Sequence, residues 1–175
     1  SEREDALKRI KEWYPESNHI IILRNPVHRA LSHYFFSVRN KKERRSLEEV
    51  FLYKNDPPPV PEGMFISPFS YIERSRYMNQ INRLTRYFPK NHTLIIIAER
   101  LFGDKQRLQE IYRWLSVDAT FVPPSLNKLI FTDPNKNHEI PADVITVIAE
   151  ELLPETNALK DYLDDEIPEW NIDTT

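Results

Sequence analysis

The chain has 175 residues, of which 40% are hydrophobic and 29% charged, the composition of a single folded domain rather than a disordered chain. A formal net charge of −3 gives no overall attraction to nucleic acid or an anionic membrane, so any anion binding must be local. The sequence has no cysteine, which excludes disulfides and thiolate chemistry. Together with the absence of a signal or membrane-spanning pattern, this favours the cytoplasm as the location. The only two glycines, Gly63 and Gly103, cannot form a glycine-rich phosphate loop.

Hydrophobic periodicity predicts an alternation of helices and strands along the chain. Two short runs of mostly β-branched residues have the pattern of strands covered on both faces, and amphipathic segments predict the helices. In chain order we expect a helix at 3–14, a strand at 19–23, helices at 26–40, 46–54 and 70–87, a strand at 92–98, a helix at 104–116, and a helical pair at 141–163 interrupted at Pro154. This order predicts a three-layer α/β fold with a parallel sheet flanked by helices.

The first strand runs into the following helix through Arg24, Asn25 and Pro26. Asn25 is a good N-cap and Pro26 suits the first helical position. Unpaired N–H groups and the helix dipole attract anions at such junctions, and the Arg24 guanidinium adds a fork suited to phosphate. Ser32 lies on the same side of the helix, roughly 10 Å further along, so one phosphate reaches both residues only by lying beside the first turns. The alternative is that Arg24 pairs with a surface carboxylate and Ser32 is an ordinary helix residue.

The segment LRNPVHRALSHY, residues 23–34, closely resembles the 3′-phosphate-binding motif of sulfotransferases that use 3′-phosphoadenosine 5′-phosphosulfate (PAPS). In that family an Arg at a strand end and a Ser eight residues later hold the nucleotide's 3′-phosphate, and Arg24 and Ser32 share this spacing. Residues 75–81, 87–89 and 94–101 resemble the downstream part of the family. There Tyr77 falls at a position close to the nucleotide, although a core tyrosine is the alternative. Lys128 or Lys136 could stand in for the family's late basic loop.

The resemblance implies a P-loop-NTPase-like sulfotransferase fold over residues 1–175 as a single domain. It also implies transfer of a sulfuryl group from PAPS, without a metal, to a hydroxyl or amine of an acceptor such as a carbohydrate or small molecule. The family's 5′-phosphosulfate loop and catalytic base lie upstream of the 3′-phosphate motif, whereas residues 1–23 supply only a helix and a strand. We therefore expect this chain to be the C-terminal two-thirds of the domain, without its N-terminal strand and loop, and we name no catalytic residue.

Two other functions remain open from the sequence. One is a non-catalytic module that binds an anion or 3′-phosphoadenosine 5′-phosphate (PAP), the nucleotide left after transfer. The other is a helical protein-interaction domain that uses the basic run 41–45 and the proline-rich loop at 56–61. Glu43 and the acids at 48–49 dilute that basic run, which favours a solvated face over a contact with acidic substrates or nucleic acid.

The histidines give no sign of a metal or nucleophile site, because His28, His33, His92 and His138 lack metal-ligand spacing. Ser32 and His33 are neighbours in a helix, so their side chains point apart. His28 is the histidine nearest a phosphate at the helix start, although a surface position is the preferred interpretation.

Overall fold

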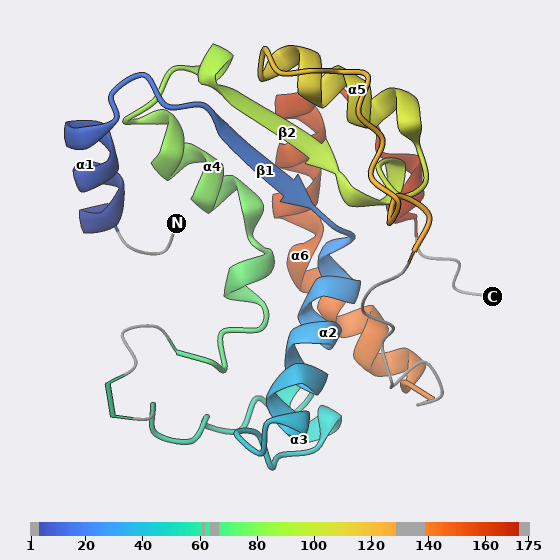
Figure 1. Cartoon of the computed structure of the whole chain (residues 1–175). Coiled ribbons are helices and arrows are strands. Elements are labelled where there is room, and N and C mark those ends of the chain that lie inside the picture. Colours follow the sequence, from blue (N-terminus) through green and yellow to red (C-terminus); the bar gives the residue numbers. More distant parts are fainter. Residues whose placement is uncertain (1–3, 61, 64–66, 129–138, 172–175) are drawn as a thin grey trace. The chain divides into compact units, whose positions relative to one another are not determined.

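A computed structural model describes residues 4–60, 62–63, 67–128 and 139–171 (Figure 1). Backbone contacts divide the chain into two compact units. The first contains residues 3–24 and 83–134, and the second contains residues 25–82 and 135–175. The expected single domain over residues 1–175 stays a prediction.

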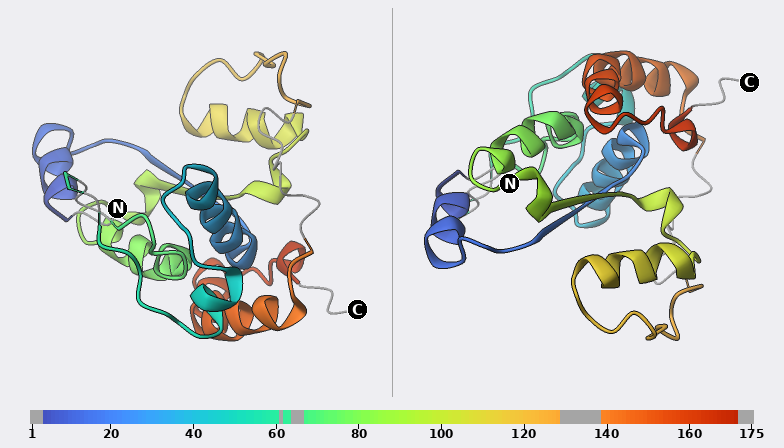
Figure 2. Two further views of the ribbon diagram at one scale, coloured as in Figure 1. Left: turned by 90° about the horizontal axis from the view of Figure 1, so that it is seen from below. Right: turned by 90° about the horizontal axis from the view of Figure 1, so that it is seen from above.

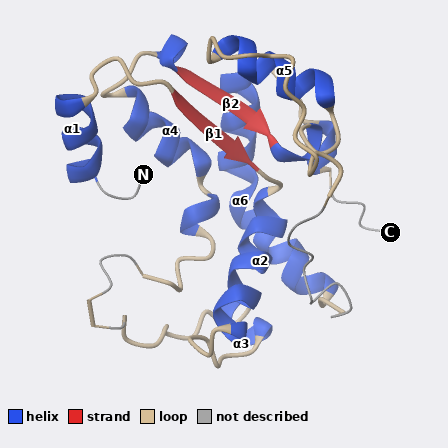
Figure 3. Cartoon of the chain, viewed as in Figure 1, coloured by secondary structure: helices blue, strands red, loops and turns tan. Residues whose placement is uncertain are grey.

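The first unit contains the sheet. Its elements are α1 (Glu4–Trp13), β1 (His19–Leu23), β2 (Thr93–Ile97) and α5 (Lys105–Trp114). Figure 3 shows the two strands running in parallel, and their register places His19 opposite Thr93 and Leu23 opposite Ile97. Beside them, the buried side chains of Leu7, Leu84 and Phe88 form a small core. The parallel α/β arrangement expected from the sequence is therefore confirmed.

One expectation about the strands is wrong, because the first strand is not covered on both faces. Ile20 and Ile22 are 39% and 57% exposed, whereas Leu23 is 2% exposed. Successive side chains in a strand point to opposite faces, so one face of β1 is open to solvent while the other packs. A run of four apolar residues does not distinguish these two environments.

The second unit is helical and contains α2 (Pro26–Arg39), α3 (Leu47–Phe51), most of α4 (Tyr77–Thr85) and α6 (Ala142–Leu163). The boundary between the units falls within α4, after Asn82. Figure 2 shows α2 and α6 side by side in both views. A core of buried apolar and aromatic side chains joins these two helices to α3 and to the segment before α4. Its members are Val27, Ala30, Leu31, Tyr34, Phe51, Phe69, Tyr71, Val144, Ile148 and Leu152.

Two helix predictions in this unit need correction. The expected interruption at Pro154 does not occur, since α6 runs unbroken through it. Val144, Ile148, Leu152 and Leu159 are all buried, and their packing on both sides of Pro154 outweighs the hydrogen bond that proline cannot donate.

The helix expected at 70–87 is also shorter than predicted. A single 3₁₀ turn covers Glu73–Ser75, Arg76 leaves helical geometry with ψ 76°, and α4 begins only at Tyr77. The Ser75 hydroxyl donates to the Pro26 carbonyl at 2.9 Å, a tertiary bond that holds the segment in this shape.

Candidate nucleotide-binding site

The start of α2 is fixed by Asn25, as the sequence predicts. The Asn25 side chain is 2% exposed, and its Oδ1 accepts hydrogen bonds from the backbone N–H groups of Val27 at 3.0 Å and His28 at 3.2 Å. Its Nδ2 donates to the Trp170 carbonyl at 3.2 Å, which ties the helix start to the C-terminal part of the same unit. Pro26 occupies the first helical position.

This cap changes the expected chemistry of the junction. We expected unpaired N–H groups at the helix tip, but the two from Val27 and His28 are bound by Asn25 itself. A phosphate at this place would therefore depend on side chains such as the Arg24 guanidinium and the Ser32 hydroxyl.

A second network holds the first turns of α2, and sequence reasoning missed it. Arg29 Nε donates to Ser75 Oγ at 2.7 Å, and its Nη2 donates to the Tyr71 carbonyl. Because Ser75 in turn donates to the Pro26 carbonyl, the helix start is joined to the segment before α4. The motif contained Arg29, but no local signal pairs it with Ser75, which is more than forty residues away in sequence.

The residues assigned to the 3′-phosphate lie on two elements. Arg24 is exposed and follows β1 directly in the first unit, and Ser32 is half-buried on α2 in the second. Their meeting around one phosphate therefore stays a prediction.

Tyr77 opens α4 with 7% of its surface exposed, and its ring centroid lies 6.0 Å from that of Trp170. The packing of Tyr77 fits the core alternative, and its role toward a nucleotide also stays a prediction.

Four further residues were named as candidates from the sequence, and the structure describes two of them. His28 is exposed on the first turn of α2, and Lys128 is exposed in the first unit. Lys136 and His138 lie outside the described residues.

His33 does not form a pair with Ser32. Its ring packs edge-on against Tyr71 with centroids 4.9 Å apart, and its Nδ1 has no hydrogen-bond partner among the described residues. Burial, together with the positive charges of Arg29 and Arg74, lowers the pKa of His33 to about 4. This imidazole is neutral at pH 7.

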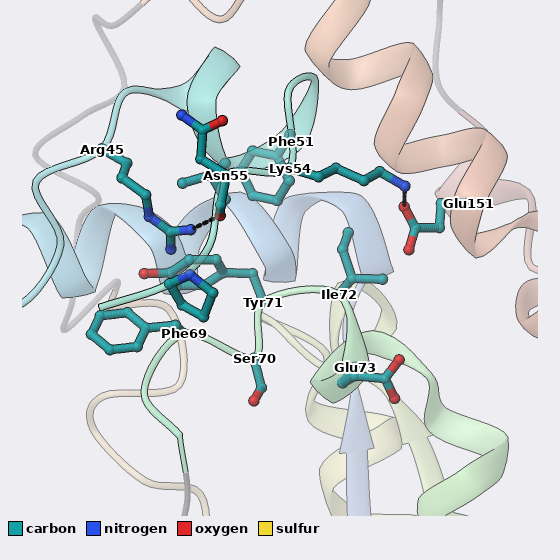
Figure 4. Close-up of a pocket in the computed structure, with 12 residues that line it drawn as sticks. Arg45, Phe51, Lys54, Asn55, Phe69, Ser70, Tyr71, Ile72, Glu73 and Glu151 are labelled. Carbon is teal, nitrogen blue, oxygen red and sulfur yellow. Dashed lines mark hydrogen bonds and ion pairs between the residues drawn. The ribbon is translucent and has the colours of Figure 1, made fainter. Parts of the chain in front are cut away.

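The second unit also contains a hollow of about 260 Å³ between α3, α6 and the segment before α4, drawn in Figure 4. Its aromatic walls are buried, and charges of both signs line it, with Lys54 and Glu151 paired at 3.0 Å. Arg24, Ser32 and Tyr77 are not among the lining residues. The hollow is therefore separate from the motif, and its balanced charge gives no preference for an anion.

The described residues contain neither a metal-binding cluster nor a membrane-spanning helix. In that part of the chain, no three His, Asp or Glu side chains come together as a possible metal site. None of the helices described is long and apolar enough to cross a bilayer.

Comparisons with known proteins confirm the resemblance that the motif indicated. A stretch of 101 residues, 58% of this chain, is 28% identical to heparan sulfate glucosamine 3-O-sulfotransferase 6 of Mus musculus. The protein of the same name from Homo sapiens is also 28% identical, over 100 residues. The matched stretch covers only 28% of the length of each of these relatives. No protein-family model matches the chain.

The fold is that of a sulfotransferase. The crystal structure of a sulfotransferase from Alicyclobacillus acidocaldarius matches 94% of this chain with a TM-score of 0.73 and 22% sequence identity. This chain covers 61% of that structure. The matched stretch of sequence and the fold are thus both similar to those of sulfotransferases.

Proposed function

We propose that this chain carries the 3′-phosphate half of a sulfotransferase site that binds PAPS. The observation that carries the proposal is the junction of β1 and α2, where Arg24, the Asn25 cap, Pro26 and Ser32 follow one another in the spacing of the family motif. The sulfotransferase fold and the two curated relatives support it.

The donor groups at this junction fit a phosphate. The Arg24 guanidinium is a permanent cation with a planar fork of donors, and the Ser32 hydroxyl donates one further hydrogen bond. Both side chains are at least partly accessible, whereas the donors at the helix tip are bound by Asn25. The 3′-phosphate therefore depends on two side chains that can be removed one at a time.

In the complete enzyme, bound PAPS supplies the sulfuryl group and a hydroxyl or amine of a carbohydrate or small molecule accepts it. We infer that the groups acting on the 5′-phosphosulfate are not supplied by this chain. The observation behind this is the glycine content, since Gly63 and Gly103 stand far apart and cannot form a phosphate loop. We expect this polypeptide alone to bind the nucleotide without turning it over.

Calorimetric titration of the full chain with PAP and with adenosine 5′-monophosphate tests the proposal. PAP, which carries the extra 3′-phosphate, should bind more tightly. Arg24→Ala should weaken PAP binding about 10- to 100-fold, since a hydrogen bond to a charged group contributes about 1.5–3 kcal/mol. Ser32→Ala should weaken it about fivefold, and neither variant should change the affinity for the monophosphate.

Arg107→Ala is the matched control, because Arg107 is an exposed arginine of the first unit that pairs with Glu110 at 3.3 Å. It should bind PAP like the unchanged protein. Equal affinity for PAP and the monophosphate, or an Arg24→Ala variant that binds PAP normally, would contradict the assigned 3′-phosphate site. Product formation from PAPS by the chain alone would contradict the half-site.

A further inference from the structure

Arg29 precedes Ser32 by three residues on α2, so the two side chains are neighbours on one face of the helix. The Arg29 side chain is half-buried and reaches the segment before α4. There its Nε donates to Ser75 Oγ at 2.7 Å, and its Nη2 donates to the Tyr71 carbonyl. Arg29 therefore holds α2 from the side that carries Ser32.

The segment that receives Arg29 is itself firmly packed. Ser75 and Tyr71 are 2% and 3% exposed, and the Ser75 N–H donates to the Ile72 carbonyl at 2.7 Å. The Tyr71 hydroxyl donates to Glu43 Oε2 at 2.9 Å. The sequence placed Glu43 on a solvated face, and that interpretation is wrong, because Glu43 is 3% exposed. Arg29 is thus bonded to a buried, hydrogen-bonded part of the second unit.

The bonds of Arg29 close a small ring at the start of α2. Ser75 Oγ accepts from Arg29 and donates to the Pro26 carbonyl at 2.9 Å, so one hydroxyl joins the first and fourth residues of the helix. The Asn25 cap holds the helix tip, whereas the bonds of Arg29 act to one side of the helix axis. They resist rotation of the first turns about that axis, and such a rotation would displace the Ser32 hydroxyl.

These contacts suit Arg29 to positioning rather than to binding a phosphate directly. Its Nε and Nη2 are engaged by a hydroxyl and a carbonyl, so this edge of the guanidinium cannot form the paired hydrogen bonds that recognise a phosphate. A binding group must be held within about 0.5 Å of its productive position by neighbours that are themselves fixed. Arg29 meets this requirement for Ser32.

The same bonds join two elements to which the family resemblance assigns nucleotide contacts. Ser32 belongs to α2, and the segment that contains Tyr71 and Ser75 leads into α4, which begins at Tyr77. A nucleotide with a 3′-phosphate needs both elements at a fixed separation. Adenosine 5′-monophosphate has no 3′-phosphate and does not depend on the place of the Ser32 hydroxyl.

We propose that Arg29 is a positioning residue, which holds the Ser32 hydroxyl in place for the 3′-phosphate by tying α2 to Ser75 and Tyr71. This role rests on the proposed function, because it acts through Ser32. Loss of Arg29 should therefore weaken the binding of a nucleotide with a 3′-phosphate and spare the binding of one without it.

Calorimetric titration of full-chain variants with PAP and with adenosine 5′-monophosphate tests the proposal. Arg29→Met removes both hydrogen bonds and the charge, whereas Arg29→Lys keeps the charge but has no planar fork to span both acceptors. Each should weaken PAP binding by about fivefold, the loss expected for Ser32→Ala, and leave the affinity for the monophosphate within about twofold.

A double-mutant cycle separates positioning from a merely structural role. In a Ser32→Ala background, Arg29→Met should weaken PAP binding no further, because the group that it positions is already absent. Ser75→Ala removes one acceptor without changing any charge and should weaken PAP binding in the same direction as Arg29→Met. Arg39→Met is the matched control, since Arg39 is an exposed arginine at the end of the same helix, and it should bind PAP like the unchanged protein.

Three results would overturn the positioning role. An Arg29→Lys variant that binds PAP normally would show that the charge alone suffices. A further loss when Arg29→Met is added to Ser32→Ala would show that Arg29 acts by another route. Equal weakening of PAP and monophosphate binding would indicate a general loss of structure. If Arg29→Met does not fold, as a denaturation curve would reveal, Arg29→Lys and Ser75→Ala decide between these outcomes.

The same titrations distinguish this proposal from the proposed function. An unchanged protein that binds PAP and the monophosphate equally would refute the 3′-phosphate site and the role of Arg29 with it. A preference for PAP that Arg24→Ala and Ser32→Ala abolish, but that both Arg29 variants retain, would refute the positioning role alone.

Discussion

The Asn25 side chain donates a hydrogen bond from Nδ2 to the Trp170 carbonyl at 3.2 Å, across most of the length of the chain. The same side chain caps α2 through Oδ1, so one buried amide fixes the helix start and attaches it to the C-terminal segment. Asn25→Ala removes both functions and should lower the free energy of unfolding by about 3 kcal/mol.

Asn25→Ser separates the two functions, because serine can cap a helix but is too short to reach Trp170. We expect a loss of about 1 kcal/mol for this variant, measured like the alanine variant by urea denaturation with an unchanged slope. If serine cost as much as alanine, the cap would contribute little and the bond to Trp170 nearly everything.

Glu43 and Arg45 form a buried ion pair in the second unit, with side chains 0% and 14% exposed. Glu43→Gln leaves the Arg45 cation without its counter-charge and should destabilise the protein by about 3 kcal/mol. Glu110→Gln is the control, because the side chain of Glu110 is 43% exposed and its pair with Arg107 lies on the surface, where the loss should stay below about 1 kcal/mol. Thermal and urea unfolding measure both.

The same carboxylate predicts an acid dependence. Burial opposes ionisation of Glu43, but hydrogen bonds from Arg45, Tyr71 and the Arg44 backbone outweigh it and hold the pKa below 4.5. A lowered folded pKa stabilises the protein above pH 4.5, and this stabilisation is lost as the pH falls through the folded value. The stability difference between the unchanged protein and Glu43→Gln should therefore shrink as the pH falls below 4.5, and a constant difference would show that the pKa of Glu43 is not lowered in the folded protein.

His33 predicts a second pH dependence at milder acidity. Its pKa is about 4 in the folded protein and 6.5 in the unfolded reference, so between these values the unfolded chain binds a proton that the folded one does not. Stability should fall as the pH is lowered from 6.5 to 4, by up to about 1.4 kcal/mol per pH unit from this group. His33→Gln should remove that component.

His28→Gln is the matched control, because His28 lies on the same helix with its side chain exposed. Its pH dependence of unfolding should follow that of the unchanged protein. An NMR titration in which the His33 ring protonates near pH 6.5 would contradict the burial of this imidazole against Tyr71.

Local signals in the sequence predicted the ends of several elements correctly. Asn25 followed by Pro26 starts α2, and Ser46 with Glu49 three residues later forms a capping box at the start of α3. These signals act within one helical turn, so they can be recognised without knowledge of the tertiary structure. The parallel pairing of the strands also follows from local order, since a helical connection separates them.

Features that depend on distant partners could not be predicted. Glu43 turns inward because the Tyr71 hydroxyl, 28 residues further along the chain, donates a hydrogen bond to its carboxylate. Helix α6 continues through Pro154 because its buried side chains pack on both sides. The candidate site likewise combines residues that the sequence pattern reveals with contacts that it does not. Arg24 and Ser32 were found by their spacing, whereas the bond from Arg29 to Ser75 joins two segments far apart in the sequence.

The exposure of β1 gives the last prediction, on two adjacent residues of one strand. Leu23 is 2% exposed and Ile22 is 57% exposed, although the sequence pattern gives them the same environment. Leu23→Ala should cost about 2–4 kcal/mol, because it leaves a cavity in a packed region. Ile22→Ala removes a side chain that is mostly in water, so its cost should stay below about 1 kcal/mol and reflect only strand propensity. Urea denaturation of both variants measures the difference, and equal losses would mean that the outer face of β1 is covered in solution.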